Sequence, residues 1–375
     1  MKILLNWRKI VIFGVYRYKN KFLYNSRMKN TKSIIMTLTT IAAMSLCFAC
    51  AKIDRVPDPT LHELTISPLS SATVKSTPEA LADGTVFGVF SYISDMSGET
   101  EWTTALPAAE SYIENAAFKY SDGIAQGWNL SSEQAQPYYW PLDGSLMFAG
   151  YSPHVSVSNE TISRVSFSSG AEGTNPHMTI PFTQNTDPTK MVDLLWFDVG
   201  DVNNGRTMSK TAEKVDVVFK HALAMLEFNI TYEHFHSVTA RLTECIFTAT
   251  FFSGRTPGWL PSDDPEKLVT LEFSPTPKPV FYMIPQFTDG TFPTMDTQIG
   301  DEIKLNLAVV GRIPKVETPD ENDYIETHFS IDIPIKDYTP RWEIGKKYVY
   351  NVSIVPKSIE FGEPTVEIKE QVFNL

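Results

Sequence analysis

Residues 215–230 read Val-Asp-Val-Val-Phe-Lys-His-Ala-Leu-Ala-Met-Leu-Glu-Phe-Asn-Ile, and the order of their side chains decides the fold class. The larger side chains occupy first odd and then even positions: Val215, Val217, Phe219, His221, Leu223 and Met225, then Leu226, Phe228 and Ile230. Such alternation is typical of β-strands, and a change of parity turns the opposite face inward. The stretch is too long for one ordinary strand. It therefore predicts either a β-bulge or a passage from one sandwich to the next.

The rest of the chain also reads as strands and turns. Residues 85–92 are rich in β-branched and aromatic types, and residues 303–310 alternate apolar with polar or small side chains. The 25 prolines and 19 glycines punctuate these runs, and no stretch sustains a capped helical period. We therefore predict an all-β protein built of β-sandwiches.

The predicted boundary between two domains lies near the parity change. A polar stretch, residues 200–213, comes just before it. A chain of about 325 residues after a leader is longer than one core usually spans. We predict domains at 51–212 and 213–375, to within about ten residues.

The N-terminus has the layout of a bacterial lipoprotein signal. A basic stretch, residues 28–32, leads into the apolar run 34–46, followed by Cys47-Phe48-Ala49-Cys50. The run is shorter than the roughly 20 residues of a membrane-spanning helix, and a buried helix of the domain is the alternative. We predict a signal peptide over 1–49, with Met28 as an alternative start, and acylation of Cys50.

Charge excludes one class of partner. Nine of the 32 basic residues and none of the 44 acidic residues precede Cys50, so the mature chain carries 23 against 44, a net charge of −21. Nucleic-acid binding needs a basic surface to neutralise phosphates, so we expect none.

Catalytic machinery is hard to find in the sequence. There is no Gly-rich phosphate loop, Gly-x-Ser-x-Gly or His-Glu-x-x-His motif. Cys245 lies in a strand-like run and reads as a buried thiol; with Cys50 acylated it has no disulfide partner. His234 with His236 lacks a third metal ligand, and Asp263-Asp264 lacks calcium-loop spacing. We expect no enzyme activity, cofactor or metal.

Aromatic residues leave two interpretations open. Tyr138, Tyr139 and Trp140, together with Trp259, could form a sugar-stacking platform or fill a sandwich core. The apolar residues 146–148 follow directly, which favours the core.

Four segments together resemble the fimbrillin family of Bacteroidetes-type bacteria, the Mfa-like and FimA-like pilus proteins. They are residues 139–153 (Tyr-Trp-Pro-Leu-Asp-Gly-Ser-Leu-Met-Phe-Ala-Gly-Tyr-Ser-Pro), 217–228 (Val-Val-Phe-Lys-His-Ala-Leu-Ala-Met-Leu-Glu-Phe), 284–286 (Ile-Pro-Gln) and 342–351 (Trp-Glu-Ile-Gly-Lys-Lys-Tyr-Val-Tyr-Asn). Residues 193–196 are similar to the family's segment ahead of the Phe-His strand. The resemblance covers most of residues 85–355.

The resemblance implies two transthyretin-like Greek-key β-sandwich domains, exported as a lipoprotein to the outer membrane. It also implies assembly by strand exchange. A protease cuts after a basic residue, the lipidated N-terminal strand leaves, and a C-terminal strand of the next subunit fills the exposed hydrophobic groove. The partners would be other pilus subunits, the outer membrane through the lipid, and a receptor on a host or bacterial surface.

This chain offers a candidate for each part of that mechanism. The displaced strand would include Leu61, Leu64 and Ile66, with the last two facing the core. Cleavage at Arg55 would leave that strand in place, whereas cleavage at Lys75 would release residues 50–75. The donor would be residues 366–375, listed by the residues of one face: Val366, Ile368 and Val372. An ordinary last strand in its own sheet is the alternative for this segment.

We therefore predict a fimbrial subunit, at the stalk, tip or base of a pilus, that serves adhesion. The alternative is a monomeric surface lipoprotein of the outer membrane that binds glycans.

Overall fold

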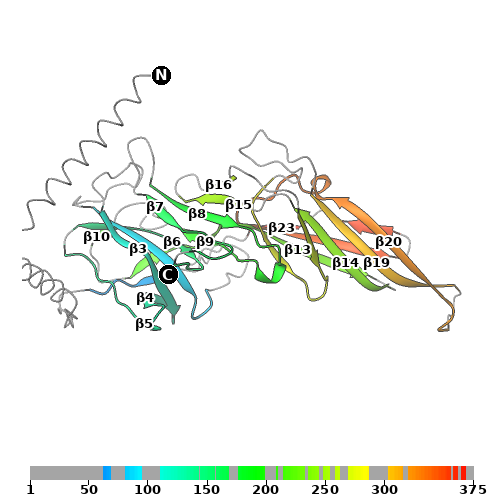
Figure 1. Ribbon diagram of the computed structural model, residues 1–375, viewed down its shortest axis with the longest axis horizontal. Coiled ribbons are helices and arrows are strands. Elements are labelled where there is room, and N and C mark those ends of the chain that lie inside the picture. Colours follow the sequence, from blue (N-terminus) through cyan, green and yellow to red (C-terminus); the bar gives the residue numbers. More distant parts are fainter. Residues whose placement is uncertain are drawn as a thin grey trace, which may run out of the picture. The chain divides into compact units, whose positions relative to one another are not determined.

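The computed structural model is almost entirely β-strand over the residues that it describes (Figure 1). These are residues 62–68, 81–94, 110–142, 144–156, 158–168, 176–198, 208–209, 214–232, 235–244, 248–253, 258–261, 269–286, 303–315, 320–355, 358–361 and 365–368. Helical structure among them is confined to two 3-10 turns, η1 (Pro188–Lys190) and η4 (Ile335–Asp337). Nothing helical in this part of the chain is long and apolar enough to span a membrane. The all-β prediction is confirmed.

Ten strands form the largest sheet. Their order is β11-β1-β4-β3-β2-β6-β9-β12, with β10 paired to β6 and β5 paired to β4. The bounds are β1 (Ile66–Pro68), β2 (Val86–Ser94), β3 (Glu110–Ser121), β4 (Ile124–Asn129), β5 (Gln134–Ala135), β6 (Ser145–Ser152), β9 (Leu195–Phe197), β10 (Met208–Ser209), β11 (Val215–Val217) and β12 (Lys220–His221). The pairing of β1 with β11 is parallel, whereas the pairing of β1 with β4 is antiparallel.

Three smaller sheets complete the described fold. The first has the order β18-β13-β21-β22, with β23 also paired to β21; the others are β17-β14-β19-β20 and β16-β15-β8-β7. Their bounds are β7 (Ser166–Ser168), β8 (His177–Thr183), β13 (Ala224–Tyr232), β14 (Phe235–Glu244), β15 (Thr248–Phe252), β16 (Gly258–Pro261), β17 (Val269–Phe273), β18 (Val280–Met283), β19 (Lys304–Pro314), β20 (Tyr324–Pro334), β21 (Lys346–Val355), β22 (Ser358–Phe361) and β23 (Thr365–Ile368). Figure 1 shows β14, β19 and β20 running side by side, as their pairing requires.

The buried side chains form two clusters. The first core lies on the ten-stranded sheet and consists of Leu64, Ile66, Leu81, Phe87, Val89, Ile113, Ala116, Phe118, Ala125, Trp140, Leu146, Phe148, Leu195, Phe197, Val215, Val217 and Phe219. The second core draws side chains from all four sheets, including Phe90, Ile180, Phe228, Phe251 and Leu307. Sheets that face each other across shared apolar side chains make a β-sandwich, as the sequence predicts.

The parity change at residues 215–230 coincides with a change of sheet. Strands β11 and β12 belong to the ten-stranded sheet, and β13 begins the next sheet at Ala224. Between them, the Ala222 amide donates to the Leu194 carbonyl, and the Gly345 amide donates to the Leu223 carbonyl. Of the two explanations for the parity change, the passage between sheets is the one that the structure contains.

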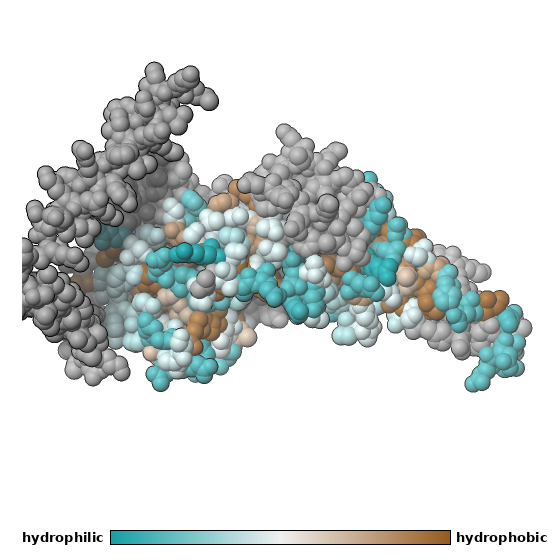
Figure 2. All heavy atoms as spheres, in the orientation of Figure 1, coloured by the Kyte–Doolittle hydropathy of each residue, from teal (hydrophilic) through white to brown (hydrophobic). Residues whose placement is uncertain are grey.

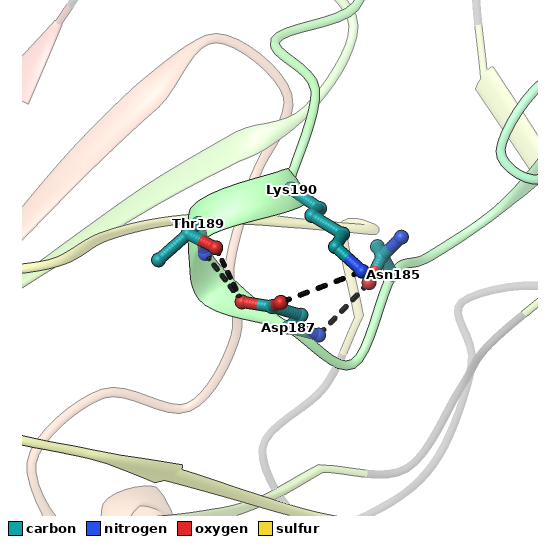
Figure 3. Close-up of polar contacts among 4 residues, drawn as sticks. All are labelled: Asn185, Asp187, Thr189 and Lys190. Carbon is teal, nitrogen blue, oxygen red and sulfur yellow. Dashed lines mark hydrogen bonds and ion pairs between the residues drawn. The ribbon is translucent and has the colours of Figure 1, made fainter.

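A hairpin from later in the chain pairs with an earlier strand. Strand β15 lies antiparallel to β8, and the Trp259 indole of β16 donates to the Ala222 carbonyl at 2.6 Å. The chain then runs from β8 to β9 through an exposed turn, in which Asp187 accepts from the Thr189 amide at 2.9 Å and lies near Lys190 (Figure 3). This is a local side-chain cap of the turn.

Candidate functional site

The strand nearest the N-terminus is enclosed within the largest sheet. Strand β1 has β4 on one side, through Ile66 opposite Ala125, and β11 on the other, through Ile66 opposite Val215. The Val215 amide donates to the Thr65 carbonyl at 2.8 Å. Residues 62–68 are called the β1 segment below, and the place that they fill in the sheet is called the β1 slot.

Backbone hydrogen bonds extend this pairing upstream of β1. The Leu64 amide donates to the Tyr138 carbonyl at 2.8 Å, and the Trp140 amide donates to the His62 carbonyl at 3.0 Å. Glu63 lies opposite Tyr139 in an isolated bridge. The β1 segment is therefore held by main-chain hydrogen bonds on both of its edges, although β1 itself is short.

The side chains of the β1 segment alternate between core and surface, and then lose the alternation. Leu64 and Ile66 are fully buried and belong to the first core, whereas His62 and Glu63 are exposed. Ser67 is also fully buried, and its hydroxyl donates to the Gly123 carbonyl at 3.2 Å. Pro68 is buried too and ends the strand, as expected of a residue without an amide hydrogen. The end of β1 is thus buried on both faces.

Closely packed rings fill the core that the β1 segment joins. Phe87 lies 5.1 Å from Phe219 in an edge-to-face contact, and Trp140 lies 6.1 Å from Phe148 in another. Tyr138 stacks on Phe118 at 5.6 Å, and burial raises the pKa of the Tyr138 phenol. The described neighbours of the β1 segment are thus apolar, apart from main-chain groups and the phenol of Tyr138. Removing the segment would expose an apolar face and unpaired backbone groups.

The strand nearest the C-terminus lies in a different sheet. Strand β23 pairs antiparallel with the first half of β21, from Ile368 opposite Lys346 to Thr365 opposite Val349. Strand β22 pairs with the second half of the same edge. The edge of β21 is therefore shared between two short strands.

Several residues predicted from the sequence lie outside the described residues. These are Cys50, Arg55, Leu61, Lys75 and Val372, together with His234, Cys245, Asp263 and Asp264. For Val366, Ile368 and His236 the structure describes the backbone alone. Among the described residues, no three His, Cys, Asp or Glu side chains are grouped so that they could hold a metal ion.

The aromatic residues considered as a sugar platform belong to the interior. Trp140 is 1% exposed and Trp259 is 5% exposed, so the core interpretation of both is confirmed. On the face drawn in Figure 2, hydrophobic surface occurs in separate small areas among hydrophilic residues. Neither indole is available to stack on a sugar.

The sequence gave no warning of two buried polar residues. Ser67 looks like any polar residue of an alternating strand, yet it is enclosed. His221 Nδ1 lies 2.8 Å from Asp193 Oδ1, with the His221 side chain 4% exposed. Their spacing in the sequence gives no signal for this pair, because it depends on the pairing of β9 with β12. The pair joins the two strands where the chain leaves the ten-stranded sheet.

The fold and the site together define a class: an all-β sandwich protein with an N-terminal strand built into its core. Within that class the chain belongs to the fimbrillin-like family, whose model matches residues 73–368. The family is one of fimbrial subunits and adhesins, which places this chain among cell-surface proteins of that kind. No curated protein matches it in sequence.

Solved structures have a similar fold. A candidate cell adhesion protein of Bacteroides uniformis is 15% identical, with a TM-score of 0.52 over 83% of this chain and 99% of that one. A candidate cell adhesion protein of Bacteroides ovatus is 17% identical, with a TM-score of 0.46 over 82% and 97%. The tip fimbrial protein Mfa3 of Porphyromonas gingivalis, truncated at its C-terminus, is 10% identical, with a TM-score of 0.33 over 84% and 100%.

Proposed function

We propose that this chain is a fimbrial subunit that is exported as a lipoprotein and polymerises by exchange of its N-terminal strand. Family membership supports the role in a fimbrium, and the signal pattern that ends at Cys50 supports export and lipid attachment at the outer membrane. Adhesion follows as the purpose of the polymer, through a receptor on a host or bacterial surface.

The observation that carries the exchange step is the burial of the β1 segment. Leu64 and Ile66 are fully enclosed although they stand close to the start of the mature chain. Full burial of each such side chain contributes about 1.5–3 kcal/mol. Loss of the segment therefore leaves a subunit with an exposed apolar slot, and filling it with another strand restores both burial and the ladder.

Cleavage at Lys75 fits this step better than cleavage at Arg55. Lys75 follows the β1 segment, so a cut there separates residues 50–75 from the rest of the chain. A cut at Arg55 removes the lipid but leaves the segment in place. The donor in this proposal is residues 366–375 of the next subunit, with Val366, Ile368 and Val372 on one face.

The proposed domains are residues 51–212 and 213–375. The change of sheet between β12 and β13 supports a division in this region. The first domain then holds the β1 slot and the second supplies the donor strand. Such a subunit has an acceptor in one domain and a donor in the other, as a head-to-tail polymer requires.

The test is limited proteolysis of residues 51–375. Trace trypsin should create a new N-terminus at Ser76 together with higher-order species in size-exclusion chromatography. The Lys75→Ala variant should stay monomeric under the same treatment, whereas Arg55→Ala should behave as the parent does. Monomers that persist after cleavage at Lys75 would overturn the exchange step, and polysaccharide binding by those monomers would favour the glycan-binding alternative.

A further inference from the structure

The β1 slot sets a requirement at each position of the strand that fills it. It encloses apolar side chains at positions 64 and 66, a small hydroxyl at 67 and a proline at 68. Position 65 is half-buried, and positions 62 and 63 are exposed. Position 67 is the most selective, because Ser67 is fully buried against the Gly123 carbonyl and a charged side chain there would lie unpaired in the interior.

The C-terminal sequence of this chain meets these requirements when it is read backwards. From residue 370 to residue 364 it runs Glu-Lys-Ile-Glu-Val-Thr-Pro, and the β1 segment runs His-Glu-Leu-Thr-Ile-Ser-Pro. Ile368 and Val366 match the two core positions. Thr365 then matches Ser67, and Pro364 matches Pro68. The charges of Glu370 and Lys369 fall at the two exposed positions.

We propose that the C-terminal strand of a second copy of this chain enters the β1 slot in the direction opposite to β1, with Thr365 at the place of Ser67. This inference rests on the strand exchange proposed above and adds the direction, the register and the identity of the partner. In this arrangement the donor runs antiparallel to β11 and parallel to β4, the reverse of β1. Both kinds of ladder satisfy the backbone.

Entry in the same direction as β1 conflicts with position 67. In that direction the residue after the one at position 66 takes the place of Ser67. The residues that follow Val366 and Ile368 are Glu367 and Lys369, so either register buries a charge. Placing Phe373 at position 66 puts Asn374 at position 67, but it also puts the Gln371 amide at the fully buried position of Leu64.

The reversed register also preserves the polar contact of the slot. The hydroxyl of Thr365 can donate to the Gly123 carbonyl of the acceptor subunit, as the hydroxyl of Ser67 does in the intact chain. In the free subunit the backbone of residues 365–368 pairs with β21. Insertion therefore replaces one ladder by another, and the donor is already extended before it binds.

Disulfide trapping distinguishes the two directions. Asp216 lies opposite Ser67 on β11, so a cysteine there faces position 67 of any inserted strand. Residues 51–375 with Cys245→Ser would supply acceptors carrying Asp216→Cys and donors carrying either Thr365→Cys or Lys369→Cys. After cleavage at Lys75 and mild oxidation, we expect disulfide-linked dimers from the Thr365→Cys donor only.

The alternative outcomes separate this inference from the proposed function. Linkage through Lys369→Cys alone would overturn the reversed direction while leaving strand exchange intact. Polymers that form without linkage from either donor would overturn the register. Failure of the cleaved protein to polymerise at all would overturn strand exchange, and this inference with it.

A peptide measurement gives a second, independent readout. A synthetic peptide of residues 362–375 should bind the cleaved subunit, and Thr365→Glu should weaken its binding by about a hundredfold or more, since it buries a charge. Glu367→Thr is the matched control, because it alters the half-buried position 65 and should leave affinity within about threefold. Equal effects of the two substitutions would refute the register.

Discussion

Truncation of Leu64 to alanine should destabilise the whole protein, although the residue lies close to the start of the mature chain. Leu64 is fully buried within the first core. The change removes three carbons, which at about 0.8 kcal/mol each account for about 2.4 kcal/mol. The cavity adds about 1 kcal/mol, because neighbouring rings such as those of Trp140 and Phe148 limit collapse. We expect a loss of about 3.5 kcal/mol in the free energy of unfolding.

Urea unfolding of residues 51–375, followed by tryptophan fluorescence, measures this loss. The matched control is Leu142→Ala, since Leu142 is 70% exposed and its truncation should cost less than about 0.5 kcal/mol. The variant should also release the β1 segment more readily, and so be cleaved faster at Lys75. A Leu64→Ala protein as stable as the Leu142→Ala control would refute the reasoning, because the β1 segment would then lie outside the cooperative core.

Three further predictions concern buried polar groups. Trp259→Phe should cost about 1–3 kcal/mol in urea unfolding, because it leaves the Ala222 carbonyl without its donor; a cost equal to that of the same change at half-buried Trp128 would contradict it. Burial lowers the pKa of His154 below its ordinary 6.5, so stability should fall as pH drops below about 6.5, and His154→Gln should flatten this loss in acid titrations of unfolding. Burial raises the pKa of Tyr350 to about 12, so stability should fall as pH rises from about 10 to 12; ultraviolet titration should find one tyrosine ionising late, and its absence from Tyr350→Phe identifies it.

The alternation of side chains was sufficient to predict the fold class. Leu305, Leu307 and Val309 alternate with smaller or polar residues in the sequence and are buried along β19. The parity change at residues 215–230 located the passage between sheets for the same reason, since side-chain direction in a strand depends only on local geometry. Local pattern carries this information without any knowledge of partners.

Strand partners could not be predicted in the same way. Nothing in residues 177–183 indicates that they pair with residues 248–252, and the parallel pairing of β13 with β21 joins strands more than a hundred residues apart. Such contacts depend on how complete sheets pack, so no single segment encodes them. The burial of Ser67 has this origin: a serine at an outward position of a strand becomes enclosed only because the Gly123 turn lies beside it.

The position of Lys75 gives the proposed pathway a single control point. Cys50 and the β1 segment both precede Lys75, so the lipid anchor and the strand that fills the slot belong to the same releasable peptide. One cut therefore frees the subunit from the membrane and exposes its acceptor slot together. Before the cut, a filled slot and a net charge of −21 on the mature chain both oppose association of subunits. After the cut, burial of apolar side chains in the slot outweighs a repulsion that salt screens over about 8–10 Å, and polymerisation begins only where the protease acts.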